Sequence, residues 1–561
     1  MSNSSSNPLC TAQTFASILS ANATVEKVDW VPAGSSYGEG KVNKGYPAIP
    51  VDLPASCAVT IKVTSSPTSS YRFGIFLPED WNSRILTQGN GGYAGGINWL
   101  DISGGLRYGF ASLSTDTGHN SEVFDMTWAM NNPEARADWG YRSIHGSVEL
   151  GKKVVAAYYS NPATYSYYSG CSTGGRQGMR EMQFSPESFD GVLAGAPSWW
   201  LPGIVSWLAE LSRYNWPADI PAHIDWKQLP TLGEAVVKQC DAVDGVEDGI
   251  ISDPRACKID FEALTCGNAN ANASSCLTSP QVELLKRLYE DYVTDTGVLV
   301  YRGLIPGTED GMAAVLNDST GNPFGVGYSR NFMDQANFTI DQWSDALAVE
   351  QLQRDPGNSS AMLYDLSTYS QRGGKFVLYQ GLADPLVPPT GSDLYYSRLV
   401  KTMGASASSR FSRYFEIPGM GHCVGTNVDA PWNFGQYIPV DGYSIPGQVD
   451  PQHDLLLALV DWVEKDKPVD SIVASTWNSP FNTSSGLLKQ RPICAYPQLA
   501  KWTGVGDVNQ PGGWTCQSNA TTMTNTTIPV ITNGVGGGSE INMMNYFTGC
   551  VSLILVLFSA L

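Results

Sequence analysis

The sequence is poor in basic residues. It contains 34 lysines and arginines against 53 aspartates and glutamates, which gives a formal net charge of -19 at pH 7. A chain with this charge repels the phosphate backbone, so nucleic acid is not expected as a partner. The charge suits a soluble, acidic, secreted protein that acts on neutral material, although charge alone does not name a substrate.

Histidines are few, and the cysteine spacing typical of zinc sites is absent. The eleven cysteines form no C-x-x-C pair, and this absence argues against the common zinc sites. Any chemistry that needs an imidazole has only five candidates: His119, His145, His223, His422 and His453.

The two ends of the chain carry opposite signals about targeting. The first 15 residues have neither a basic start nor an apolar core, so no signal peptide is present in the given N-terminus. The 16 residues from Tyr546 form an apolar tail, shorter than the roughly 20 residues that span a bilayer. Small residues and a polar spacer precede this tail, which is the pattern of a GPI-anchor signal.

We therefore expect an extracellular or cell-surface protein that meets a membrane only through a C-terminal lipid anchor. A retained single-pass span and a C-terminal helix packed on the domain are the alternatives. Anchor attachment requires entry into the secretory pathway, and a start upstream of Met1 would provide it.

Cysteines and sequons support this compartment. Ten cysteines lie outside the tail, and eight of them are spaced for local pairing as Cys10 with Cys57, Cys240 with Cys257, Cys266 with Cys276, and Cys494 with Cys516. The nine N-x-S/T sequons begin at Asn3, Asn22, Asn272, Asn317, Asn337, Asn358, Asn482, Asn519 and Asn525. Together they favour an oxidising, glycosylating environment.

A serine within a glycine-rich turn is the first candidate for chemistry. The pattern G-x-S-x-G occurs around Ser36 and around Ser172. Ser36 has loop-like, proline-broken surroundings and no helix after it, whereas Ser172 follows an aromatic, strand-like run and precedes a helical pattern. We interpret Ser172 as a nucleophile on a sharp strand-to-helix turn, with a plain glycine turn as the alternative.

A serine nucleophile needs a histidine base further along the chain. His223 follows Ser172 too closely to leave room for further strands, and His453 opens an amphipathic helix. His422 follows a strand-like run and a glycine-rich turn, as a base on a loop should. It is the predicted base, and a buried, hydrogen-bonded core histidine is the alternative.

The carboxylate that orients the base is predicted after a buried strand. Residues 375–380 form an apolar run, and Asp384 lies in the loop that follows it. A carboxylate just past the carboxyl end of a central strand is where such a site needs one. Asp393 is the weaker candidate because it lies inside the next helical pattern.

The two cysteines left after local pairing flank these candidates. Cys171 directly precedes Ser172, and Cys423 directly follows His422. If the serine and the histidine are in contact, their neighbours are within disulfide reach, and a bond between them would fix the nucleophile against the base.

These motifs resemble the tannase and feruloyl esterase family of secreted serine esterases. The resemblance rests on "GCSTGGRQG", "GLADPLVPP" and "GMGHC", which together match the family's CS-D-HC arrangement, and on "GNGGYAGG" and "STDTGH" nearer the N-terminus. It extends from about Cys10 to Cys516 and does not include the GPI-like tail. It implies an α/β-hydrolase fold with a large inserted lid domain.

The resemblance and the composition of the tail together divide the chain into four parts. Residues 199–364 are irregular, aromatic and rich in cysteines and sequons, as expected of a lid. The predicted parts are a first catalytic segment at 1–198, the lid with a calcium loop at 199–364, a second catalytic segment at 365–520, and a Thr/Asn/Gly-rich linker with the apolar tail at 521–561.

An ester hydrolase of this kind needs an oxyanion hole. One N–H is expected from Thr173, the residue after the nucleophile, and another from an early glycine-rich loop at Gly91 or Gly92. A plain glycine turn is the alternative for either glycine.

An acidic loop at 240–257 suggests a structural calcium ion. Its aspartates are separated by turn-forming glycines and bracketed by cysteines, and oxygen-only ligands suit calcium. The loop lacks the features of an EF-hand, and a solvated acidic turn is the alternative. The resemblance implies as ligands Asp241, Asp244, Asp248 and the carbonyls of Val246 and Ile250.

Two classes of function follow. In the first, Ser172 attacks a hydroxycinnamate or gallate ester, free or attached to plant polysaccharide or tannin, while His422 transfers the proton and Asp384 orients it. The sequence does not distinguish tannase from feruloyl esterase. The second is a surface binding protein with an inactive hydrolase fold, and the intact serine, aspartate and histidine count against it.

Overall fold

A computed structural model describes residues 7–268, 271, 276–316, 320–436 and 444–518. All of these lie in the first of two units of the chain, Met1–Asn525; the second unit is Thr526–Leu561. The predicted anchor signal and the sequons at Asn3, Asn272, Asn317, Asn519 and Asn525 lie outside the described residues. Among the described residues, no helix is both long enough and apolar enough to cross a membrane.

A nine-stranded sheet forms the centre of the fold, in the order β1-β2-β3-β5-β4-β6-β7-β10-β11. Within this order, β5, β4, β6, β7, β10 and β11 are parallel to one another, and β3, β2 and β1 add an antiparallel edge beside β5. Their bounds are β1 Ala23–Val31, β2 Ser56–Ser66, β3 Ser69–Pro78, β4 Arg84–Gln88, β5 Ala111–Thr115, β6 Tyr165–Cys171, β7 Gly191–Gly195, β10 Lys375–Gly381 and β11 Ser412–Ile417.

Helices cover both faces of this sheet because its strands are apolar on both sides. In β6, Tyr167 packs in a core with Leu459 of α15, whereas the next residue, Tyr168, faces Gly178 of α5 on the other side. The helices that contact the sheet include α2 Trp99–Arg107, α4 Ser143–Tyr159, α5 Thr173–Phe184, α13 Pro389–Met403, α14 Ala405–Phe411 and α15 Leu455–Lys465.

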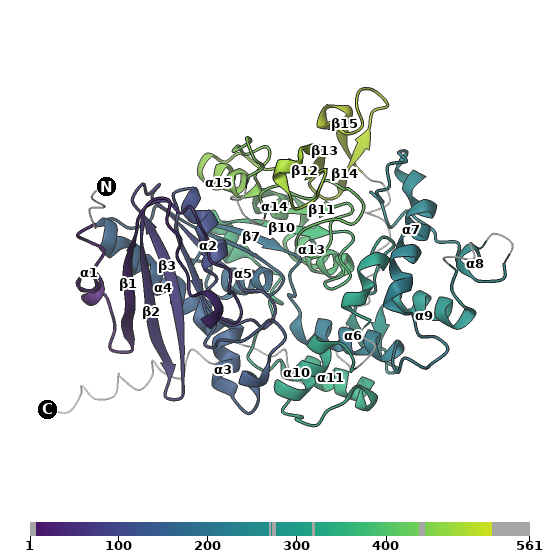
Figure 1. Cartoon of the computed structure of the whole chain (residues 1–561), viewed down its shortest axis with the longest axis horizontal. Helices are drawn as coiled ribbons and strands as arrows, with labels where there is room; N and C mark the ends of the chain where they lie inside the picture. Colours follow the sequence, from purple (N-terminus) through teal and green to yellow (C-terminus); the bar gives the residue numbers. More distant parts are fainter. Residues whose placement is uncertain (1–6, 269–270, 272–275, 317–319, 437–443, 519–561) are drawn as a thin grey trace. The chain divides into compact units, whose positions relative to one another are not determined.

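A long insertion separates β7 from β10, and Figure 1 shows its helices grouped away from β1, β2 and β3. Its longest helix, α6, is buried along most of its length and packs against α10 and α11. The predicted lid at 199–364 falls within this insertion, and its role as a lid stays a prediction. The elements are α6 Leu201–Tyr214, α7 Leu229–Cys240, α8 Phe261–Leu264, α9 Ser279–Tyr289, β8 Tyr292–Val293, β9 Leu299–Tyr301, α10 Pro323–Asn331, α11 Asp345–Arg354 and α12 Ser367–Gln371.

The remaining elements are short. Two hairpins follow α15, formed by β12 Ser471–Trp477 with β13 Leu487–Cys494 and by β14 Gln498–Trp502 with β15 Trp514–Ser518. The other α-helices are α1 Ala12–Ala16 and α3 Pro133–Ala137. The single turns are η1 Gly40–Val42, η2 Thr127–Ala129, η3 Asp138–Arg142, η4 Trp226–Gln228, η5 Asp241–Asp244, η6 Glu309–Ala314, η7 Ile340–Gln342, η8 Thr483–Ser485 and η9 Pro511–Gly513.

Parallel strands covered by helices, with a serine at the turn from β6 to α5, form an α/β-hydrolase fold, as the sequence predicts. The structure contains the four disulfides that the cysteine spacing predicts, Cys10–Cys57, Cys240–Cys257, Cys266–Cys276 and Cys494–Cys516. It also contains Cys171–Cys423, the pair predicted from its position beside Ser172 and His422.

Candidate active site

Ser172 lies at the turn between β6 and α5. Its backbone has φ 62° and ψ -122°, a conformation that L-residues seldom adopt and that costs free energy unless the surroundings hold it. The Ser172 N–H donates to the Gly195 carbonyl (2.9 Å), and the Ser172 carbonyl accepts from the Arg176 N–H (3.0 Å). The end of β7 and the first turn of α5 therefore hold the strained residue in place.

The glycines around Ser172 are needed for close packing. A Cβ atom on Gly170 would lie 2.8 Å from the carbonyl carbon of Gly174, and one on Gly175 would lie 2.5 Å from the Gly195 carbonyl oxygen. Both contacts are with backbone, which cannot move aside. The glycine richness of this motif thus allows the sharp turn and brings α5 close to β6 and β7.

Asp384 lies in the loop after β10 and is completely buried. Its Oδ1 atom accepts from the Leu386 N–H (2.9 Å) and the Val387 N–H (3.0 Å). Its Oδ2 atom accepts from Gln380 Nε2 (3.1 Å) and lies 2.7 Å from His422 Nδ1. The carboxylate is therefore fixed in orientation, with one oxygen directed at the imidazole.

His422 lies in the loop after β11, and its side chain is 24% exposed. The loop closes on itself, because the Gly421 N–H donates to the Gly425 carbonyl (3.0 Å) and the Val424 N–H to the His422 carbonyl (2.8 Å). With Nδ1 held by Asp384, the other ring nitrogen of His422 is the one left to exchange a proton with a substrate or a nucleophile.

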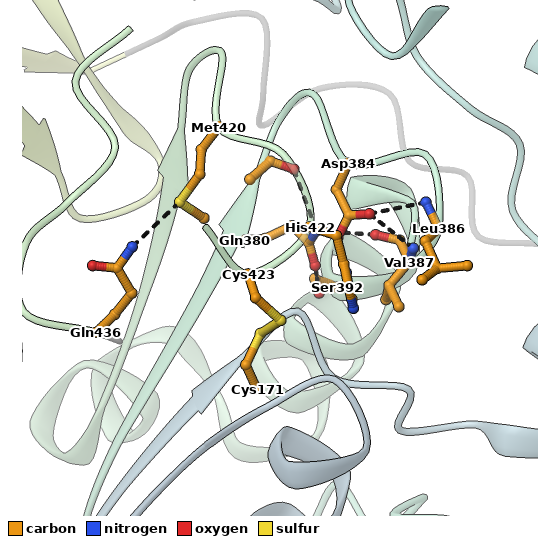
Figure 2. The surroundings of a disulfide bond; sticks show 11 residues. Cys171, Gln380, Asp384, Leu386, Val387, Ser392, Met420, His422, Cys423 and Gln436 are labelled. Atoms are coloured by element: carbon orange, nitrogen blue, oxygen red, sulfur yellow. Dashed lines mark hydrogen bonds and ion pairs between the residues drawn. A yellow bond between two sulfur atoms is a disulfide. The ribbon is translucent and has the colours of Figure 1, made fainter. Parts of the chain in front are cut away.

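The disulfide Cys171–Cys423 joins the end of β6 to this loop, with the two Cα atoms 5.9 Å apart. Figure 2 shows the bond beside His422 and Asp384, with Leu386 and Val387 on the far side of the carboxylate. Because each cysteine is the sequence neighbour of Ser172 or His422, the covalent bond restricts how far these two residues can separate.

Ser172 and His422 line one cavity of about 510 Å³. Its wall also includes apolar and aromatic side chains: Pro47, Leu100, Val123, Phe124, Phe324 and Leu386. A second, smaller hollow adjoins it at Ser172 and is lined by Leu201, Ile204, Val205 and Leu208 of α6. A cavity with apolar walls and a few polar groups at one point is the usual form of a small-molecule site.

One further ionisable group lies in the cavity wall. Asp101, in the first turn of α2, accepts from Asn98 Nδ2 (2.7 Å). Burial raises the pKa of Asp101 to about 7, and the hydrogen bond from Asn98 opposes this only in part. The wall therefore loses a negative charge in mildly acidic solution.

The predicted oxyanion residues lie beside Ser172. Thr173 is the first residue of α5, where N–H groups have no acceptor within the helix. Gly91 and Gly92 line the same cavity as Ser172 and His422. The Gly91 N–H donates to the Tyr46 hydroxyl (2.8 Å), so of the two glycines only Gly92 has its N–H without an acceptor among the described residues.

The weaker candidates lie elsewhere. Asp393, a partly buried residue of α13, forms an ion pair with Arg255 and accepts from the Tyr414 hydroxyl (2.9 Å) on β11. His223 Nδ1 contacts the Asn215 carbonyl (2.8 Å), and His453 pairs with Asp450 (3.0 Å). Ser36 lies in a turn region and is absent from the lining of the described cavity.

The two remaining histidines are also outside the cavity lining. Burial lowers the pKa of His119 to about 3, so it is neutral in the core. A hydrogen bond to Glu181 raises the pKa of His145. Of the five histidines, His422 lines the described cavity at Ser172, and its role as the base stays a prediction.

The acidic loop at 240–257 is closed by its own backbone. The Asp241 carboxylate accepts from the N–H groups of Asp248 (3.1 Å), Gly249 (2.9 Å) and Ile250 (3.2 Å). Asp248 also pairs with Arg491. No cluster of three or more metal-ligating side chains occurs within the described ranges.

Two carboxylate oxygens in this loop nevertheless lack partners. Asp244 Oδ2 and Asp248 Oδ1 are buried without a hydrogen-bond donor within the described chain. Buried carboxylate oxygens without donors are costly, and a hard cation such as calcium is the ligand that would satisfy them. The donor set thus fits the predicted ion in chemistry.

Sequence reasoning missed a second polar residue beside the acid. Gln380 ends the buried run of β10, donates to Asp384 and to the Val387 carbonyl (3.0 Å), and accepts from Ser392 Oγ (2.8 Å). Figure 2 shows it close to Asp384 and His422. A polar amide at the end of an apolar strand was the signal that could have identified it.

Comparison with known proteins gives a uniform result. The family model described as "Tannase and feruloyl esterase" matches residues 57–517. Feruloyl esterase B of Aspergillus niger is 33% identical over 502 residues, which cover 88% of this chain and 93% of that protein.

Solved structures agree with the sequence relatives. The crystal structure of feruloyl esterase B from Aspergillus oryzae superposes with a TM-score of 0.83 at 30% identity, covering 91% of this chain and 99% of that one. Tannin acyl hydrolase from Aspergillus niger, at 20% identity, has a TM-score of 0.70 over 92% of this chain and 96% of its own, and shares the fold. The chain belongs to the tannase and feruloyl esterase family.

Proposed function

We propose that this protein is a carboxylic ester hydrolase that cleaves esters of phenolic acids. Ser172 is the nucleophile, His422 the general base and acid, and Asp384 the residue that orients His422. The single observation that carries this assignment is the buried Asp384 carboxylate, 2.7 Å from His422 Nδ1. The loop that carries His422 is in turn bonded by Cys171–Cys423 to the strained turn at Ser172.

The reaction follows from these positions. Ser172 Oγ attacks the ester carbonyl carbon while its proton passes to His422. The tetrahedral oxyanion then collapses, and the alcohol leaves with the proton from His422. Water, activated by the same histidine, attacks the acyl-serine, releases the phenolic acid and restores Ser172. Asp384 stabilises the imidazolium in both halves of the cycle.

The acyl group is proposed to be a hydroxycinnamoyl rather than a galloyl group. The hollow beside Ser172 is lined mainly by leucine, isoleucine and valine side chains of α6 and by Phe324, which favour a flat, mostly apolar acid. A galloyl ring would bring three hydroxyl groups into this lining, and unpaired buried hydroxyls are costly. Feruloyl esterase B of Aspergillus niger, a relative at 33% identity, bears the name of this activity, which supports the same choice.

The insertion after β7 is proposed to act as the lid over the site. It supplies Leu201, Ile204 and Phe324 to the walls around Ser172, so its sequence determines which acids fit. The alcohol that leaves, whether a small molecule, a plant polysaccharide or a tannin, is not restricted by these residues.

A structural calcium ion is proposed for the acidic loop, held by Asp241, Asp244 and Asp248 with the carbonyls of Val246 and Ile250. The orphaned oxygens of Asp244 and Asp248 support this proposal. Protein dialysed against calcium-free buffer should retain about one ion per chain by elemental analysis. Asp244→Asn should lower both the metal content and the thermal stability; if neither changes, the loop is only an acidic turn.

The compartment is proposed to be extracellular, because five disulfides persist only under oxidising conditions. A lipid anchor at the C-terminal tail is part of the same proposal. Release of the esterase from intact cells by a phosphatidylinositol-specific phospholipase would support the anchor, and a membrane-bound enzyme that keeps its apolar tail would contradict it.

The function is tested with purified protein and a panel of methyl esters of ferulic, p-coumaric, caffeic and gallic acids. Methyl ferulate or p-coumarate should be hydrolysed faster than methyl gallate. Ser172→Ala should lower kcat by about 10³-fold or more, and Ser36→Ala should leave it unchanged. A fluorophosphonate probe should label Ser172 alone. Failure to hydrolyse any ester, together with no labelling, would contradict the proposal.

A further inference from the structure

Within the part of the chain that the structure describes, one backbone N–H group of the loop at 89–96 has no acceptor. Along this loop the N–H groups of Gly89, Tyr93, Ala94, Gly95 and Gly96 donate to the carbonyls of Ser169, Val123, Gly91, Ser121 and Asp116. The N–H groups of Asn90 and Gly91 donate to side chains. Only the Gly92 N–H has no acceptor among the described residues, and Gly92 lines both hollows at Ser172.

Gln177 accepts a hydrogen bond from the Asn90 N–H, the first of the two N–H groups that precede Gly92. It lies in the second turn of α5, the helix that begins after Ser172, and is only 2% exposed. Its Oε1 accepts from the Asn90 N–H (2.9 Å), and its Nε2 lies 3.3 Å from Asn90 Oδ1. Asn90 Nδ2 in turn donates to the Thr115 carbonyl (2.8 Å) on β5. Asn90 is thus tied to the nucleophile helix and to the sheet.

Tyr46 takes up the second. Its hydroxyl oxygen accepts from the Gly91 N–H (2.8 Å), and its side chain forms part of the cavity wall. Gly91 itself has open space where a Cβ would be, so no side-chain packing at this position holds the peptide. The hydrogen bond to Tyr46 is therefore the contact that fixes it.

The backbone of the loop then determines where the Gly92 N–H is placed. The Ala94 N–H donates to the Gly91 carbonyl (3.1 Å), which makes Gly92 and Tyr93 the central residues of a β-turn. Gly92 has φ 51° and Tyr93 does not have a positive φ, the pattern of a type II′ turn. In such a turn the N–H of the first central residue makes no bond within the turn. The small hollow at this point is lined by Gly92, Ser172 and Thr173 together.

We propose that Gln177 and Tyr46 are positioning residues. Gln177 accepts from the Asn90 N–H and Tyr46 accepts from the Gly91 N–H. With both N–H groups bonded, the Gly92 N–H is held as the second donor of the oxyanion hole, opposite Thr173. This inference rests on the proposed esterase function. It selects Gly92 over Gly91 and gives the Gln177 of the "GCSTGGRQG" motif a role in the reaction, through the loop rather than by touching the substrate.

The physical reason is preorganisation. A donor aimed at the developing oxyanion lowers the barrier only if it needs no rearrangement when the charge forms, and losing one such donor costs about 10²- to 10³-fold in kcat. A Gln177 side chain that cannot accept would leave the Asn90 N–H buried and unpaired, so the loop would turn to satisfy it. The ground-state ester, which carries little charge on its carbonyl oxygen, would bind almost as before.

The test compares Gln177→Leu with a matched control, Gln351→Leu. Gln351 is also a fully buried amide with two side-chain hydrogen bonds, to Ser206 and Ser329, but it lies in the insertion. We expect Gln177→Leu to lower kcat for methyl ferulate by about tenfold or more with KM within about threefold, as for an interaction made only in the transition state. Gln351→Leu should cost stability without this effect on kcat.

Two further variants separate positioning from folding. Gln177→Glu keeps an oxygen acceptor for the Asn90 N–H and, when its carboxyl is protonated, a donor for Asn90 Oδ1. In mild acid it should therefore recover most of the kcat that Gln177→Leu loses at the same pH. Tyr46→Phe frees the Gly91 N–H and should also lower kcat, whereas Tyr159→Phe, which removes a remote hydroxyl bond to the Pro78 carbonyl, should not. Inhibition by a trifluoromethyl ketone analogue of the ester should weaken in proportion to each loss of kcat.

The outcomes are distinct from those of the proposed function. If the unaltered protein hydrolyses no ester, the proposed function fails. If it is an active esterase and Gln177→Leu changes only KM, or lowers kcat no more than Gln351→Leu does, Gln177 is a packing residue and the inference is overturned.

Discussion

At the scale of single residues, the site depends on hydrogen bonds of two kinds. Asp384 is oriented by neighbours within four residues, namely Gln380, Leu386 and Val387. Such local arrangements can be recognised in the sequence, here as the strand-like run at 375–380 followed by "GLADPLV". Asn90 and Gln177 are 87 residues apart and Tyr46 is 45 residues from Gly91, so these contacts exist only after the sheet forms.

For this reason the sequence predicts the serine, the acid and the base but not the residues that hold the oxyanion loop. Ser172 could be chosen over Ser36 from the sequence because strand-like and helical patterns flank only Ser172. The sequence could not decide between Gly91 and Gly92, because that decision depends on which N–H group donates to the Tyr46 hydroxyl.

We predict that Asp384→Asn lowers kcat by about 10³- to 10⁴-fold with little change in KM. The asparagine oxygen can still accept from the Leu386 and Val387 N–H groups, but its amide nitrogen then faces His422 Nδ1 and favours the wrong tautomer. Steady-state kinetics on methyl ferulate measure the effect, and circular dichroism checks that the fold is kept.

Asp393→Asn serves as its control, because Asp393 is a partly buried carboxylate on α13 that pairs with Arg255 rather than His422. This variant should lose stability while its kcat stays within a few-fold of the unaltered enzyme. A similar loss of kcat in both variants, or a loss below tenfold in Asp384→Asn, would remove Asp384 from the proposed triad.

At the scale of elements, the site is assembled from the carboxyl ends of neighbouring parallel strands. Ser172 follows β6, Asp384 follows β10 and His422 follows β11, and the sheet order places β7 between the first two. Sequence patterns predict these strands individually, since each is a short apolar run before a polar loop. They do not predict the exchange of β4 and β5 in the sheet, which depends on pairing between residues far apart.

One element boundary was predicted wrongly. His453 was assigned to the start of the amphipathic helix, but α15 begins at Leu455. The Asp454 side chain accepts from the Leu457 N–H (3.0 Å) and caps the helix, so the aspartate ends the preceding loop. The amphipathic pattern indicated the helix correctly. Its first residue depended on which polar side chain caps the backbone N–H groups, and this is Asp454.

The disulfide between elements gives a prediction of its own. Cys171→Ala with Cys423→Ala should lower kcat by about tenfold or more, because the serine turn and the histidine loop are then free to separate. The double variant should still fold, since β6 and β11 remain in the sheet. Kinetics and thermal unfolding of the same preparation give both quantities.

The matched control is Cys10→Ala with Cys57→Ala, which removes a disulfide that joins the N-terminal segment to β2 far from the Ser172 cavity. It should lower the melting temperature with kcat almost unchanged. If the two double variants lose activity and stability in the same proportion, Cys171–Cys423 only stabilises the fold and does not position the reacting residues.

At the scale of the whole molecule, burial governs several carboxyl groups. Asp116 and Glu309 are at most 6% exposed, and burial raises the pKa of each to about 7. Asp454 is completely buried, and burial raises its pKa to about 6. An unfolded chain has carboxyl pKa values of about 4, so the folded protein binds more protons than the unfolded chain between about pH 4 and pH 7.

This difference determines the sign of the pH dependence. Because the folded state holds the extra protons, the stability from these groups is complete below their unfolded pKa and is lost as the pH rises through the folded values. The net charge of -19 at pH 7 acts in the same direction, since self-repulsion grows as carboxyls ionise. The protein is therefore expected to be more stable in mild acid than at neutral pH.

We predict that the melting temperature at pH 5 exceeds that at pH 8 by about 5 °C or more, measured by differential scanning calorimetry at constant ionic strength and constant calcium concentration. Glu309→Gln tests the cause. An amide oxygen in the place of Oε1 can still accept from the Tyr289 hydroxyl and from the Gly307 N–H (3.2 Å), but the group no longer titrates. The variant should gain stability at pH 8 relative to pH 5, so its melting temperature should fall less over this range. A melting temperature that rises from pH 5 to pH 8, or an unchanged slope in Glu309→Gln, would show that groups other than the buried carboxyls control the stability of this enzyme.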